Sequence, residues 1–245
     1  MKERVHEEPK IMAAAERRMQ AWARSQELAG QGGVPESAPT RRLGPYITLS
    51  RQAGAGGGEI AQLVGAQLGW EVLDKALVDR VAERYRLSRP MLDFVDETSS
   101  SWVHNILGPW LDRGVVAQEK YLVRLTRVML AAARRGNVVI VGRGAQFLLP
   151  RKHGLAVRVV APLKFRVARL ARLRNCTAAE AQKLVAELDQ GRKQFVEQFF
   201  HHDVEDPTVY DLVLNVDHLG CATAAELIVA AYRAEREKAA GTACA

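Results

Sequence analysis

Short apolar segments rich in β-branched residues alternate with longer stretches of helical periodicity over most of the chain. The segments typical of strands are Tyr46–Ser50, Glu71–Leu73, Val138–Val141, Ala156–Val160 and Leu212–Asn215. The helical stretches are Gly58–Leu68, Ala76–Tyr85, Val116–Arg135, Lys164–Arg174, Ala178–Phe200 and Ala224–Lys238. Because parallel strands need long crossover connections, this alternation predicts an α/β fold, a parallel sheet covered by helices on both faces.

The chain divides into an extension and one folded domain. We expect residues 1–44 to form an N-terminal extension, helical in part and followed by the glycine- and proline-rich linker 30–42. A frayed extension is favoured over a partner-binding helix, because weakly apolar termini are commonly disordered. Residues 45–240 form the predicted domain, with an irregular insertion at about 87–115 and a helical lid at about 166–192. Thr177, followed three residues later by Glu180, predicts a capping box that starts the lid's second helix.

The composition argues for a cytoplasmic protein without a membrane segment. No uncharged apolar run reaches the roughly 18 residues of a membrane-spanning helix, and the N-terminal residues MKERVHEEPK lack the apolar core of a secretory signal. Cys176, Cys221 and Cys244 are scattered and form no C-x-x-C pair. A disulfide framework and a cysteine-rich zinc site are therefore not expected.

Positive charge is concentrated in one part of the chain. The formal net charge is +7, and residues 151–174 hold basic side chains without a single acid. Such a surface favours anionic partners. A local cluster fits a phosphate site better than a nucleic-acid track, and few aromatic residues alternate with the basic ones to stack on bases. Nucleotides are thus the expected partners, RNA is the weaker alternative, and the oligomeric state is left open.

A glycine-rich turn follows the first strand and leads into an amphipathic helix, in the segment ITLSRQAGAGGGEIAQLVGAQL. Glycines allow close backbone approach, and the free N–H groups at the start of a helix attract anions. The candidate phosphate-binding residues are Gln52, Gly54, Ala55, Gly56, Gly57, Gly58 and Glu59.

The turn departs from the phosphate-binding pattern G-x-x-x-x-G-K-[ST]. Gly57 stands where the lysine belongs, and Glu59 stands near the hydroxyl position. Arg51, at the mouth of the turn, is a candidate replacement charge. Glu59 is a candidate Mg²⁺ ligand, or it only complements the helix dipole. The competing interpretation is a glycine turn that merely connects strand and helix.

Several motifs in order along the chain resemble the cytidylate kinase-like family. They are S-R-Q-x-G with the glycines after it, L-D-K, V-V-I-V-G-R-G-A, A-P-L-x-x-R, D-x-x-R and Y-D-L-V-L-N. The resemblance spans Pro45 to about Tyr232. It implies a P-loop kinase fold with a five-stranded parallel sheet. It also implies transfer of a phosphoryl group from ATP, with Mg²⁺, to CMP or dCMP.

The resemblance also implies residue roles. Asp74 and Arg80 follow the second strand as in cytidylate kinases, and Arg143 keeps the arginine of their D-G-R-D turn. Asp189 and Arg192 match their D-x-x-R on the lid-side helix. These five residues are the expected substrate-binding residues. The absence of the loop lysine, the loop hydroxyl and the turn acids affects groups that hold the γ-phosphate and Mg²⁺.

Arg166 and Arg169 follow the A-P-L turn at a predicted strand end, where ligands of open parallel sheets bind. We expect them, with Arg51, to stabilise transition-state charge, although a solvated helix face is the alternative. The leading hypothesis is an ATP-dependent kinase that acts on CMP, dCMP or a related phosphorylated acceptor. The alternative is a catalytically inactive nucleotide-binding regulatory module.

Overall fold

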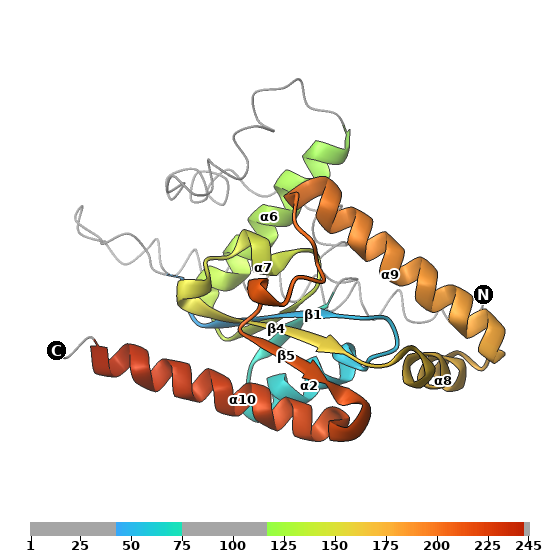
Figure 1. Ribbon diagram of the computed structural model, residues 1–245. Helices are drawn as coiled ribbons and strands as arrows, with labels where there is room; N and C mark the ends of the chain where they lie inside the picture. Colours follow the sequence, from blue (N-terminus) through green and yellow to red (C-terminus); the bar gives the residue numbers. More distant parts are fainter. Residues whose placement is uncertain (1–42, 75–116, 243–245) are drawn as a thin grey trace. The chain divides into compact units, whose positions relative to one another are not determined.

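The computed structural model describes residues 43–74 and 117–242 (Figure 1). Contacts divide the chain into two units, one of residues 1–43 with 75–134 and one of residues 44–74 with 135–245. The first unit contributes helix α6 (Ala117–Arg135), except for its last residue, to the described part. Almost all of the predicted extension 1–44, the predicted helix 76–85 and the insertion 87–115 lie outside the described residues.

The second unit is built on a parallel sheet of five strands in the order β2-β3-β1-β4-β5. The strands are β1 (Tyr46–Arg51), β2 (Glu71–Leu73), β3 (Val138–Val141), β4 (Gly154–Val160) and β5 (Leu212–Asn215). The helices are α2 (Gly57–Leu68), α7 (Ala145–Leu148), α8 (Leu163–Arg174), α9 (Ala178–Phe200) and α10 (Val216–Thr242). Two short 3₁₀ turns are η1 (Arg151–His153) and η2 (Pro207–Val209). The predicted α/β class and the five-stranded parallel sheet are confirmed.

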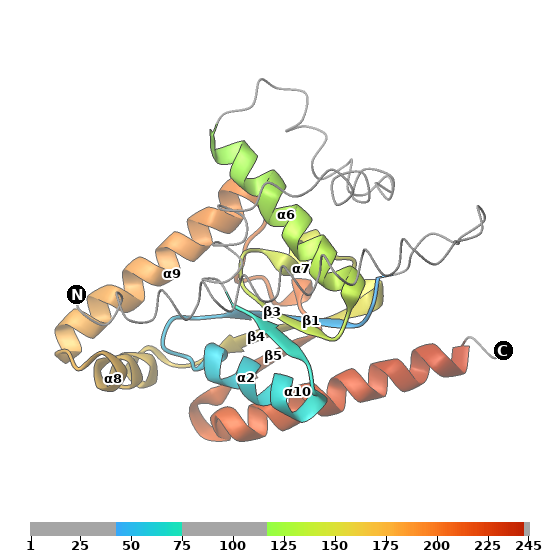
Figure 2. The ribbon, with the colours of Figure 1, turned by 180° about the vertical axis from the view of Figure 1, so that it is seen from behind.

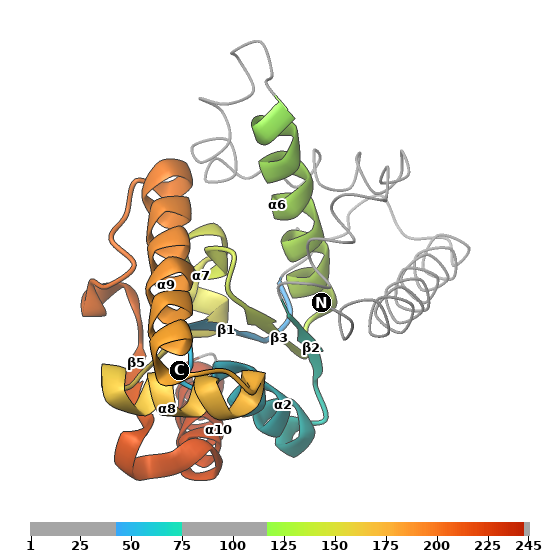
Figure 3. The same ribbon diagram turned by 90° about the vertical axis from the view of Figure 1, so that its right-hand side faces the viewer.

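Different helices cover the two faces of the sheet. Helices α2 and α10 lie side by side on one face, as Figure 2 shows from behind. The core on this face joins alternate residues of the central strands, such as Ile47 and Val157, to Ile60 of α2 and Ile228 of α10. Helix α9 lies on the opposite side of the sheet from α10 (Figures 1 and 3). Apolar burial therefore anchors β1 and β4 at the centre of the sheet.

Local sequence signals set where helices α9 and α10 begin or break. Helix α9 has its predicted bounds, because Thr177 accepts the N–H of Glu180 while the Glu180 side chain accepts the N–H of Thr177. Helix α10 begins at Val216 and not at the predicted Ala224. Gly220, with φ 70° and ψ 170°, interrupts it, so the first turn and the long helix are distinct pieces. Among the described helices, none combines the length and apolar character that crossing a membrane requires.

Candidate functional site

The glycine loop runs from the end of β1 to the start of α2 at the carboxyl edge of the sheet (Figure 1). Gly56 caps α2 in the left-handed region with φ 82°, where a glycine costs least. The backbone N–H groups of Gly57, Gly58 and Glu59 donate no hydrogen bond to any described residue. Three free amides at the positive end of a helix form a site for an anion.

The side chain of Arg51 fills the space beside Gly57, the position at which other phosphate-binding loops carry a lysine. An ideal Cβ on Gly57 would lie 2.7 Å from both Cβ and Cγ of Arg51 and 3.2 Å from Cδ2 of Leu49. The guanidinium extends to Gly142 after β3, where a Cβ would overlap its Nη1 atom. Two glycines therefore make room for one arginine, which places a cation between the ends of β1 and β3.

The electrostatic environment of Arg51 is crowded with positive charge. Burial, together with the charges of Arg192 and Arg143 and against those of Asp74 and Asp189, lowers the pKa of Arg51 to about 10. Arg51 is protonated at neutral pH, and among the described residues the two neighbouring cations act on it more strongly than the two carboxylates do. A group of cations in this condition favours an anionic ligand.

Arg143 lies in a turn with a strained backbone after β3. Gly142, Arg143 and Gly144 all have positive φ, of 82°, 55° and 68°. Left-handed backbone is rare for a residue with a long side chain, and such outliers gather at functional sites. The Arg143 guanidinium lies 5.1 Å from the ring centroid of Phe195 on α9, a cation–π contact that orients it.

Asp189 connects α9 to the start of the glycine loop. Its Oδ1 accepts the backbone N–H of Ala53 at 2.7 Å, and its Oδ2 accepts from Nη1 of Arg166 at 2.6 Å. Arg192 donates from Nη1 to the carbonyl oxygen of Arg51 at 3.0 Å and lies 3.4 Å from Asp189 Oδ1. Both halves of the D-x-x-R motif thus hold the loop backbone in this structure.

The guanidinium of Arg166 makes hydrogen bonds and an ion pair within the protein. Its side chain, 10% exposed, donates from Nε to the carbonyl of Ala161 at 2.9 Å and from Nη1 to the carbonyl of Ala53 at 3.3 Å. The backbone carbonyl of Arg166 also packs so closely on Gly54 that a Cβ there would overlap it. These contacts hold the loop in place and are not those of a solvated helix face, whereas the role of Arg166 in stabilising transition-state charge stays a prediction.

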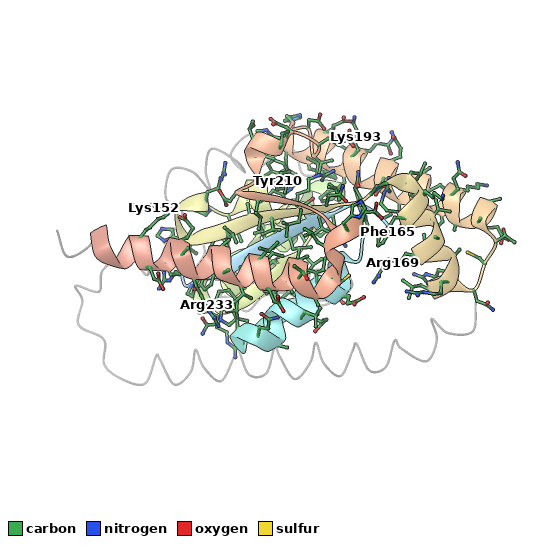
Figure 4. The ribbon with its side chains drawn as sticks, turned by 60° about the horizontal axis from the view of Figure 1, so that its bottom comes forward. Lys152, Phe165, Arg169, Lys193, Tyr210 and Arg233 are labelled. Carbon is green, nitrogen blue, oxygen red and sulfur yellow. The ribbon has the colours of Figure 1, made fainter. Side chains whose placement is uncertain are left out.

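Arg169 lies one turn further along α8, beside the start of α2 (Figure 4). It forms an ion pair with Glu59, and the Cζ atom of Arg169 would lie 3.3 Å from a Cβ on Gly56. Cys221, after β5, also lies beside Gly56, since its Sγ would be 2.7 Å from a Cβ there. Burial raises the pKa of the Cys221 thiol. The carboxylate of Glu59, half exposed at the mouth of the loop, is thus neighboured by one cation and by the free amides of α2.

The structure brings most of the predicted site residues together. The loop 52–59, Arg51, Arg143, Asp189 and Arg192 lie at the carboxyl edge of one sheet, joined by the contacts above. Asp74 is exposed just after β2, and it contributes to the potential at Arg51. Arg80 lies outside the described residues.

Sequence reasoning missed Arg158, which is 6% exposed on β4. The signal was present, because a lone charged residue interrupts the apolar strand 155–160. The sequence alone could not tell whether this side chain points into the protein or out of it.

One carboxylate among the described residues, that of Glu59, is suited to a magnesium ion. Among these residues, no group of three or more His, Cys, Asp or Glu side chains could hold a metal ion by itself. Mg²⁺ typically takes one or two protein carboxylates and completes its shell with water and substrate phosphates. The exposed carboxylate of Glu59, next to free amides that suit phosphate, meets that limited requirement.

Comparisons with known proteins show which proteins this chain is similar to. A model of the cytidylate kinase-like family matches residues 46–218. The chain is 27% identical over 175 residues to a cytidylate kinase of Thermococcus kodakarensis, covering 71% of this chain and 80% of that protein. It is 33% identical over 90 residues to one of Pyrococcus horikoshii, covering 36% of this chain and 46% of that protein.

A solved structure shares the fold. An uncharacterized protein from Eubacterium ventriosum superposes with a TM-score of 0.62 at 16% identity, covering 77% of this chain and 98% of that one. The family match includes the glycine loop, the Gly142–Gly144 turn and the D-x-x-R motif. On this evidence, the chain belongs to the cytidylate kinase-like family.

Proposed function

We propose that this protein is a kinase that transfers the γ-phosphoryl group of ATP to CMP or dCMP. One observation carries the proposal. Free backbone amides at the start of α2 lie at the same sheet edge as three cations, Arg51, Arg143 and Arg192. Family membership and the cytidylate kinase relatives favour a nucleotide as the phosphoryl acceptor.

The donor phosphates would bind at residues 52–59, where the free N–H groups of Gly57, Gly58 and Glu59 would donate hydrogen bonds to the phosphate oxygens. Arg51 would supply the charge that a loop lysine gives other phosphate loops, since it crosses beside Gly57. Glu59 would hold Mg²⁺, which when bound neutralises phosphate charge. Arg169 would take part once its contact with Glu59 is exchanged for a phosphate.

The acceptor would attack through an oxygen of its own phosphate. A new bond forms between that oxygen and the γ-phosphorus, the bond from the γ-phosphorus to the bridging oxygen breaks, and ADP leaves. No general base is needed, because the attacking oxygen is already ionised. The task of Arg143 and Arg192 is to hold the acceptor and to offset its charge, and positioning supplies most of such catalysis.

A coupled assay of ADP formation with ATP, Mg²⁺ and a panel of nucleoside monophosphates tests the proposal. Turnover should be fastest with CMP or dCMP, and Arg143→Met should lower kcat/KM, whereas Arg233→Met on the exposed face of α10 should leave it unchanged. No ADP from any acceptor at high enzyme concentration would refute the kinase. Calorimetric binding of a non-hydrolysable ATP analogue without turnover would then support the inactive regulatory module.

A further inference from the structure

Arg158 is a buried cation that no described carboxylate neutralises. It is 6% exposed, and only its Nη1 donates hydrogen bonds, to Oγ of Ser50 at 3.2 Å and to the hydroxyl of Tyr210 at 3.4 Å. Its Cζ lies 5.6 Å from the Tyr210 ring centroid. Its Nε and Nη2 reach no partner among the described residues. A buried charge without a counter-ion is costly, so an anion bound beside it would relieve that cost.

A second unpartnered group lies on the same face of the sheet. Oγ1 of Thr48 is buried and makes no hydrogen bond within the described part of the chain. Ser50 is paired with Arg158 across β1 and β4, and Thr48 lies two residues earlier on β1. The alternate residues Ile47 and Leu49 belong to the core on the other face. The two hydroxyls and the guanidinium therefore share the face away from α2 and α10.

Arg192 approaches this face from α9. Burial lowers its pKa, and the charges of Arg158 and Arg166 add to that effect while Asp189 opposes it. Asp189 already accepts from Ala53 N–H and Arg166. Positive charge is thus in surplus behind the glycine loop, and two cations, Arg158 and Arg192, come from different elements to the same region.

We propose that Arg158, together with Ser50 and Arg192, binds the anionic group that the acceptor already carries, a phosphate monoester. The Nε and Nη2 atoms of a guanidinium form a planar fork that suits two phosphate oxygens. A dianion there would balance Arg158, which has no carboxylate partner among the described residues, and would lie near Arg192, whose counter-ion Asp189 is shared with Arg166. The choice of acceptor rests on the proposed function, whereas the anion site itself does not. The site selects acceptors that are already phosphorylated against unphosphorylated nucleosides.

Thermal unfolding of the full chain in increasing inorganic phosphate tests the site without relying on catalysis. Phosphate should stabilise the wild type. Arg158→Met should fold at least as stably as the wild type in the absence of phosphate, because it removes an unbalanced buried charge. Its apparent phosphate affinity should fall about tenfold or more, the loss expected for a charge-assisted hydrogen bond. Arg158→Lys should recover part of the response, and the exposed Arg233→Met should behave as the wild type.

A loss of phosphate affinity below tenfold in Arg158→Met would overturn the inference, since the phosphate would then bind elsewhere, such as at the glycine loop. A lower stability of Arg158→Met without phosphate, with its response retained, would assign Arg158 a structural role only. Should Arg158→Met not fold, Ser50→Ala decides, because it deletes one hydroxyl: a weaker phosphate response supports the site, and an unchanged one refutes it.

Kinetics separate this inference from the proposed function. In Arg158→Met, the KM for CMP should rise about 10- to 100-fold while the KM for ATP stays within about twofold. Turnover by this variant with an unchanged KM for CMP would refute the acceptor site and leave the kinase standing. A wild type without turnover, whose phosphate response still depends on Arg158, would refute the kinase and leave the anion site.

Discussion

The close packing of Arg51 on Gly57 predicts that a larger residue at position 57 destabilises the protein, which would account for the absence of the loop lysine. Gly57→Ala would place a Cβ 2.7 Å from Cβ and Cγ of Arg51. Gly57 has no positive φ, so the substitution strains no backbone, and its cost is steric. Overpacking of this kind costs about 1–3 kcal/mol of folding free energy.

Replacing Arg51 by glycine should remove the steric cost of Gly57→Ala. In Arg51→Gly the two colliding atoms are gone, and only Cδ2 of Leu49 remains near, at 3.2 Å. Gly57→Ala should then be neutral, or stabilising by about 0.4–1 kcal/mol through the unfolded chain. The coupling energy of the double-mutant cycle is therefore about 1–3 kcal/mol. Urea unfolding of the four proteins measures it.

Gly58→Ala is the matched control. An ideal Cβ on Gly58 meets no atom within 4 Å, and Gly58 also lacks a positive φ, so alanine should be tolerated there. If Gly57→Ala destabilises the protein no more than Gly58→Ala does, the steric argument fails. A coupling energy with Arg51→Gly below about 0.5 kcal/mol, the usual additivity error, would refute it equally.

The same pair predicts an exchange of charge. Arg51→Gly alone should lower kcat about 100- to 1000-fold, the loss typical of one transition-state charge donor. Gly57→Lys alone should be destabilised, because its side chain meets Arg51. The double variant Arg51→Gly, Gly57→Lys should recover part of the lost turnover. Turnover in the double variant as low as in Arg51→Gly would contradict the assignment of the lysine's role to Arg51.

Three further predictions concern the surroundings of the loop. Asp189→Asn should destabilise the protein by about 2 kcal/mol in urea unfolding, because Arg166 loses its partly buried counter-ion; a loss under about 0.5 kcal/mol would contradict this. Since Arg51 must stay protonated and its pKa is lowered to about 10, a pH profile of kcat/KM should be flat near pH 8 and fall through about pH 10. Arg51→Lys should move that fall to lower pH, and an unmoved profile would exclude Arg51 as its source. Glu59→Gln should change stability by less than about 1 kcal/mol, since its pair with Arg169 is half exposed, and it should raise the Mg²⁺ concentration needed for half-maximal turnover; an unchanged Mg²⁺ dependence would exclude Glu59 as a metal ligand.

The layout of the elements was predictable because its signals are local. Apolar periodicity located all five strands, and the Thr177 capping box located the start of α9. The glycine turn after β1 was also recognisable, since its residues are contiguous. The early start of α10 was missed, because it depends on how a single residue, Gly220, bends the backbone between two helical pieces.

The partners of the candidate site could not be predicted in the same way. The sequence predicts that Arg166 acts on a ligand, but it does not reveal that the carboxylate partner of this arginine, Asp189, lies on the next helix. Neither periodicity nor spacing tells which carboxylate a long side chain will meet, because that depends on how α8 packs against α9.

The sequence by itself determined the α/β class, the places of the strands and the position of a glycine turn before a helix, since each depends on neighbours along the chain. Only the tertiary structure decided that Arg51 passes between Gly57 and Gly142, and that Arg158 is buried beside Ser50 without a counter-ion among the described residues. Both facts follow from the strand order, which sets β1 between β3 and β4 and so brings residues distant in sequence within contact distance.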